Sequence, residues 1–174
     1  PVEENNEYQA SAQVFYMESV TPTDPALLNL LLIREIRKAI DSGILEEVNS
    51  HISILPGSVK NTCVGLKIGI PERITNDYNK ISFVEFRSRE IVDIVADFLT
   101  RYIKPFSKAY VASIASEVGV RTGRKSIGKQ YLTKMEVLSS THFDDGIANG
   151  AWPIEYWGFG KRVKMEYFAV DSYY

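Results

Sequence analysis

Apolar residues change their spacing along this chain in a definite order, from every second residue to every third or fourth and back again. Alternate apolar positions from Tyr8 to Tyr16 are typical of a half-buried strand, and strict alternation from Val64 to Ile70 predicts another. Between them lies a segment with helical spacing, marked by Leu28, Leu32, Ile36 and Ile40. Asp24 is placed to cap that helix and Gly43 suits its end.

The same reading extends to the rest of the chain. A long helix is predicted from about Ser82 to Ile103, ending before Pro105. The remaining expected elements are a strand at 51–55, a turn at Pro56-Gly57, a strand at 109–120, short helical turns at 133–138 and 143–150, and a closing strand at 163–169.

This order of strands and helices predicts an α+β fold, with a mainly antiparallel sheet and two main helices packed on one face. Polar and acidic residues 1–7 are expected to be a linker or frayed end, and residues 8–174 a single domain. The chain starts at Pro1 and stops in a strand-like segment, so we expect a domain excised from a longer protein. Its compartment, whether cytoplasmic or exported, stays open.

Charge and composition argue against several classes of function. A net charge of −2 gives no broad basic surface for nucleic acid. One cysteine, Cys63, and two histidines argue against a metal centre. No apolar run reaches the roughly 18 residues of a membrane helix, so no transmembrane segment is expected.

The stretch GRKSIGKQ, from Gly123 to Gln130, imitates a phosphate-binding P-loop. Gln130 stands where a P-loop has the Ser or Thr that binds magnesium. Thr133 is placed to cap a helix that starts later, so no helix is expected directly after Lys129. A P-loop enzyme is therefore the least favoured of three interpretations, and it predicts magnesium-dependent binding of ATP or GTP.

Read more widely, the segment from Glu117 to Glu155 resembles a block found in a family of bacterial FAD-dependent oxidoreductases. The matching features are Gly119, Val120, Arg121, Arg124, Gly128, Leu132, Thr133, Phe143, Asp145, Ile147, Ala148, Gly150, Trp152, Pro153, Ile154 and Glu155. The chain departs from the family pattern at Thr122-Gly123 and at Tyr131, and Glu155 replaces a shorter acid.

The resemblance implies that residues 8–174 are the substrate-side domain of a flavoenzyme that transfers hydride between an organic substrate and FAD. The parent protein would bind FAD through a separate FAD-binding domain, and the fragment alone is not expected to hold it. The expected partners are that domain and a small-molecule substrate. No G-x-G-x-x-G follows a strand in this sequence.

The resemblance and side-chain chemistry together single out five candidate site residues. Arg121 and Arg124 would bind an anionic group of substrate or cofactor, because guanidinium offers a fixed fork of donors. Trp152 and Glu155 would contact substrate or cofactor, and His142 is the candidate for catalytic proton transfer. The alternative is a non-enzymatic module that binds a sugar or a protein through the aromatic and basic region 121–157.

Overall fold

The computed structural model describes residues 10–72, 78–121, 127–156 and 164–174. They fall into two compact units. The larger unit runs from Ala10 to Arg121, and the smaller contains the residues after Arg121 together with those before Ala10. The expectation of one domain over residues 8–174 stays a prediction.

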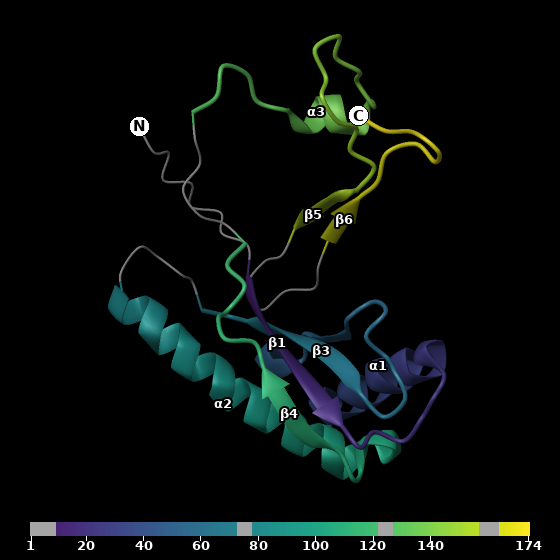
Figure 1. The fold of residues 1–174 in the computed structure, drawn as a ribbon, viewed down its shortest axis with the longest axis vertical. Coiled ribbons are helices and arrows are strands. Elements are labelled where there is room, and N and C mark those ends of the chain that lie inside the picture. Colours follow the sequence, from purple (N-terminus) through teal and green to yellow (C-terminus); the bar gives the residue numbers. More distant parts are fainter. Residues whose placement is uncertain (1–9, 73–77, 122–126, 157–163) are drawn as a thin grey trace. The chain divides into compact units, whose positions relative to one another are not determined.

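The larger unit is an antiparallel sheet with two long helices. Its elements are β1 (Ser11–Glu18), α1 (Pro25–Asp41), β2 (Ile52–Ile54), β3 (Val64–Ile70), α2 (Tyr78–Tyr102) and β4 (Tyr110–Ile114), with short 3-10 turns at Glu47–Asn49 and Lys104–Phe106. The strand order is β2-β3-β1-β4, and each neighbouring pair is antiparallel. Figure 1 shows β1 running between β3 and β4. The predicted α+β class is confirmed.

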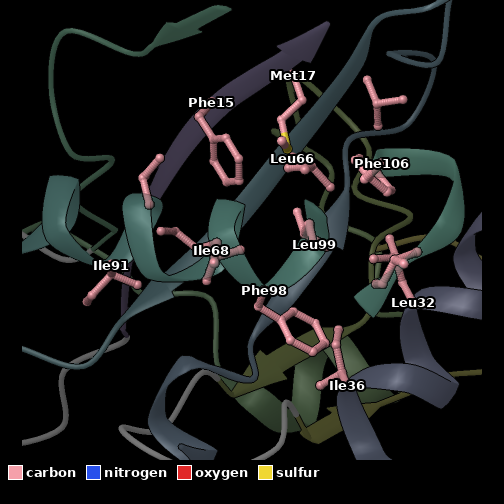
Figure 2. Close-up of a cluster of buried hydrophobic side chains, with 14 of the residues drawn as sticks. Phe15, Met17, Leu32, Ile36, Leu66, Ile68, Ile91, Phe98, Leu99 and Phe106 are labelled. Carbon is pink, nitrogen blue, oxygen red and sulfur yellow. The ribbon is translucent and has the colours of Figure 1, made fainter. Parts of the chain in front are cut away.

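Both helices bury their apolar stripes against the same face of this sheet. Phe15 from β1 and Leu66 from β3 are fully buried there, beside Leu99 of α2. Figure 2 shows these side chains in one cluster, with Leu32 and Ile36 of α1 also directed into it. Burying one large apolar side chain stabilises a fold by about 1.5–3 kcal/mol, so this cluster is the main source of stability in the unit.

The buried face of β1 is not the one that its apolar pattern singled out. Phe15 and Met17 face the helices, together with Gln13, which is also fully buried. Tyr16 and Val14 lie on the opposite face, where Tyr16 is partly exposed. The difference arises because a polar residue inside the core obscures the alternation.

Helix α1 follows its capping signals at both ends, whereas some apolar residues expected on the buried faces of the two helices, Leu30, Ile33, Ile94 and Tyr102, are exposed. Asp24 Oδ1 accepts hydrogen bonds from the amides of Ala26 and Leu27, both at 3.0 Å, which satisfies two of the free donors at the start of α1. Gly43 follows the helix with φ of +70°, a conformation that favours glycine. Helix α2 begins at Tyr78, somewhat before the expected start at Ser82.

The smaller unit has little regular structure among its described residues. It contains α3 (Lys134–Leu138) and an antiparallel pair, β5 (Ile154–Tyr156) and β6 (Lys164–Glu166). Helix α3 begins after Thr133, as expected, so no helix follows Lys129 directly. The helical turn expected at 143–150 is instead a tight turn closed by the Gly146 amide on the Phe143 carbonyl, at 3.0 Å.

The strands near the end of the chain differ in part from the expected ones. Strand β5 was not expected from the sequence, and Val163 of the expected closing strand lies outside the described residues.

In the described part of the chain, no helix combines the length and apolar character needed to cross a bilayer.

Candidate functional site

Arg121 is the last residue of the larger unit, and the irregular segment after β4 leads to it. Past Ile114 the chain continues beside β1. The Ala115 amide donates to the Val14 carbonyl at 2.8 Å, and Gly119 and Ala12 exchange backbone hydrogen bonds at 2.7 and 3.1 Å. Arg121 follows two residues after this bridge and is exposed. Arg124, the second candidate arginine, lies outside the described residues.

The smaller unit contains a shallow cavity of about 250 Å³. It is lined by residues from two stretches of the family-like block: Gln130, Tyr131, Leu132, Phe143, Asp145, Gly146 and Ile147. Four of these side chains are large and apolar or aromatic, and Ile147 is fully exposed. Asp145 adds one carboxylate to the wall. Such a surface fits a small flat group that carries a hydrogen-bond donor.

A capping box fixes the chain next to this cavity. The Thr133 amide and hydroxyl both donate to Glu136 Oε2, at 2.6 and 2.7 Å, and the Glu136 amide donates back to Thr133 Oγ1 at 3.3 Å. These bonds from Thr133 hold the pKa of the Glu136 carboxyl below its usual value. Because Leu132 directly precedes the cap, the start of α3 holds one wall of the cavity in place.

His142 and Trp152 both contact the dipeptide Tyr173-Tyr174. His142 stacks on the Tyr173 ring with centroids 4.5 Å apart, and its Nε2 donates to the Tyr173 carbonyl at 3.2 Å. The Tyr174 hydroxyl donates to the Trp152 carbonyl at 3.2 Å. Gly150 and Tyr174 exchange backbone hydrogen bonds at 2.7 and 2.9 Å. Trp152 as a residue is 64% exposed, so it is available to a ligand.

Glu155 lies on β5, paired across the strands with Met165, and is half-buried. Its neighbour Tyr156 has two lysine ammonium groups near its ring, Lys134 at 5.7 Å and Lys164 at 5.6 Å from the centroid. Both lysines form ion pairs with Glu166. The Glu166 carboxylate raises the pKa of Lys134, and Lys134 in turn lowers the pKa of Glu166.

The structure therefore brings His142 and Trp152 to one place, on the same dipeptide, and puts Glu155 in the same unit. Arg121 belongs to the larger unit. Sequence reasoning missed Gln130 and Tyr131 as cavity residues. Their position inside the family-like block was the available signal. Among the described residues, no three potential ligand side chains gather closely enough to hold a metal ion.

Comparisons with known proteins agree with the resemblance. A family model described as FAD dependent oxidoreductase matches residues 3–174, which is nearly the whole chain. No curated protein and no solved structure is significantly similar to it.

Proposed function

The chain belongs to the FAD-dependent oxidoreductase family, and we propose that it is the substrate-side part of such an enzyme. In this proposal the whole enzyme moves hydride between a small organic substrate and FAD. The chain described above supplies surfaces that bind and orient the substrate. A separate FAD-binding domain of the same parent protein is its partner.

The observation that carries this proposal is the uncovered apolar lining of the cavity in the smaller unit. Tyr131 is 52% exposed, Leu132 53% and Ile147 102%. Exposed apolar groups gathered in one hollow are typical of a surface that a ligand or a neighbouring domain covers. Leu132 and Ile147 are among the features that carry the family resemblance, which favours a surface used by the family.

The size of the cavity decides how much of FAD it fits. Sites for drug-sized ligands measure about 300–1,000 Å³, whereas this hollow measures about 250 Å³. It has room for a single small ring system, so this hollow fits one wall of a flavin or substrate site and not a complete dinucleotide site. When bound, FAD supplies hydride acceptance or donation, and the protein supplies orientation and electrostatics.

The candidate residues take distinct roles in this proposal. Arg121 holds an anionic group of the substrate or cofactor, because its guanidinium presents paired donors. Trp152 offers an exposed indole for stacking, and Glu155 accepts a hydrogen bond from the ligand. His142 transfers a proton through Nδ1, because its Nε2 already donates to the Tyr173 carbonyl.

The test uses the full-length parent protein. Its visible spectrum after desalting shows whether a flavin is retained, and candidate substrates are then screened by bleaching of the flavin band. Arg121→Ala and Trp152→Ala are expected to weaken flavin retention or to raise the substrate concentration that is needed to bleach the flavin band. Arg101→Ala is the matched control, since Arg101 is an exposed arginine of α2 that pairs with Asp97 at 2.7 Å.

A folded parent without flavin colour would rule out this proposal. In that case the exposed aromatic residues of region 121–157 would favour the alternative, a non-enzymatic module for a sugar or a protein. Retained flavin with Arg121→Ala behaving like the Arg101→Ala control would keep the enzyme assignment and reject the role of Arg121.

A further inference from the structure

The backbone between β4 and Arg121 is held by side chains as well as by backbone hydrogen bonds. Strand β4 ends at Ile114, and the regular pairing with β1 is already shifted by a bulge between Tyr16 and Met17. Beyond this point the segment Ala115–Gly119 makes only three backbone hydrogen bonds to β1. Its other polar groups need partners from elsewhere, because a buried amide or carbonyl without one is costly.

Helix α2 supplies two of those partners. Glu85 Oε1 accepts a hydrogen bond from the Val118 amide at 2.7 Å, and Val118 itself is buried. Glu85 Oε2 accepts from Arg89 at 2.9 Å, and the same guanidinium donates to the Ser116 carbonyl at 3.2 Å. A carboxylate bound to a backbone amide makes a charge-assisted hydrogen bond, which is stronger than a neutral one.

Strand β1 supplies the third partner from inside the core. Gln13 is fully buried, and its Nε2 donates to the Ala115 carbonyl at 2.9 Å. A buried amide side chain among apolar residues is destabilising unless it is hydrogen-bonded. Its bond to Ala115 satisfies the Nε2 end of this amide, while Oε1 has no hydrogen-bond partner among the described residues. The Nε2 bond joins β1 to the segment that leads to Arg121.

We infer that Glu85 is a positioning residue for Arg121, assisted by Arg89 and Gln13. Together these side chains fix the backbone of Ala115, Ser116 and Val118. Arg121 follows three residues after Val118, so its position at the edge of the sheet is fixed as well. A guanidinium held in this way loses less freedom when it binds an anion. The functional part of this inference rests on the role proposed for Arg121.

The structural part is tested on the 174-residue chain with a nitroxide spin label. The label is attached to Arg121→Cys in a Cys63→Ser background, because Cys63 is the free thiol of the chain. Glu85→Ala is expected to narrow the label's spectral lines, and Glu85→Gln, which keeps an acceptor for the Val118 amide, is expected to restore most of the ordered spectrum. Exchange of the Val118 amide should become about tenfold faster in Glu85→Ala and change much less in Glu85→Gln.

A second label at Arg101→Cys, in the last turn of α2, is the control. In Glu85→Ala, unchanged spectral lines from the label at 101 together with narrower lines from the label at 121 support the inference. Narrower lines at both positions would mean general damage to α2 and would overturn the inference. Unchanged lines at 121 would overturn it as well. Should Glu85→Ala fail to fold, Arg89→Ala, which removes the donor to Ser116, is expected to loosen the label at 121 in a folded chain.

The functional part uses flavin retention by the full-length parent protein. If Glu85 acts through Arg121, Glu85→Ala is expected to weaken retention, and the double variant should lose no more than Arg121→Ala alone. Additive losses would overturn this part. If Arg121→Ala retains flavin and substrate response fully, the proposed role of Arg121 fails, and the label spectra still decide whether Glu85 positions the segment.

Discussion

The ring of Tyr16 lies directly against Gly65, its antiparallel partner across β1 and β3. A β-carbon at Gly65 would stand 2.8 Å from Tyr16 Cε1 and 2.9 Å from the Ser58 β-carbon. Real β-carbons almost never come so close, so the glycine is required by packing on the sheet face opposite the helices. The sequence of β3 shows a glycine at this position, but only the strand register reveals that the Tyr16 ring occupies the space where a β-carbon would stand.

The first prediction follows from that contact. Gly65→Ala is expected to lower the free energy of unfolding by about 1–3 kcal/mol, because overpacking forces neighbouring groups to move. Denaturant unfolding of the chain measures the change. Ser113→Ala is the control, since Ser113 is exposed and lies on the other side of Tyr16 in the sheet, and it should change stability by less than about 0.5 kcal/mol. Equal effects of the two substitutions would refute the packing argument.

The second prediction compares two phenylalanines. Phe15 is fully buried between the sheet and the helices, whereas Phe86 on α2 is 76% exposed. Phe15→Ala is expected to cost about 3–5 kcal/mol through lost burial and the cavity left behind. Phe86→Ala should cost less than about 1 kcal/mol. Denaturant unfolding of both variants checks this. A loss of unfolding free energy for Phe15→Ala as small as that for Phe86→Ala would mean that Phe15 is not part of the buried core.

The helices were predictable from sequence because their signals are local. Asp24 and Pro25 mark the start of α1, and the apolar spacing predicts which face is buried. The buried face of β1 was not predictable in this way. Gln13 lies at a core position, where its Nε2 donates to the Ala115 carbonyl, which is far away in the sequence. A pattern of apolar residues contains no information about such a partner.

The candidate site shows the same division. Leu132, Phe143 and Ile147 are matching features of the family-like block, and the structure brings them to one hollow that the sequence did not predict. Periodicity could not find it, because the hollow is built from irregular segments. The contact of His142 with Tyr173 also depends on how the end of the chain folds back, which no local signal records.

The third prediction concerns the start of α3. Thr133→Ala removes the hydroxyl of the capping box and should destabilise this helix start by about 1 kcal/mol. Faster amide exchange across Lys134–Leu138 measures the effect. Thr133→Ser keeps the hydroxyl and serves as the control, with near-normal exchange expected. If the two variants exchange alike, the capping box does not stabilise α3.

The fourth prediction concerns acid sensitivity of the larger unit. His51 packs over Gly69, where a β-carbon would stand 2.9 Å from the His51 β-carbon. Within the described part of the chain, the buried Nε2 of His51 has no hydrogen-bond partner. Burial lowers the pKa of His51, and the nearby Glu47 carboxylate offsets this only in part.

The sign of the effect follows from that direction. An unfolded histidine takes up a proton near pH 6.5, whereas folded His51 resists protonation until a lower pH. The free energy of unfolding should therefore fall as the pH drops below about 6.5 and stop falling on this account below the folded pKa. His51→Gln should remove that part of the acid sensitivity, measured by denaturant unfolding at about pH 7.5 and pH 5.5. His142→Gln is the control, and an equal reduction in both variants would contradict the assignment to His51.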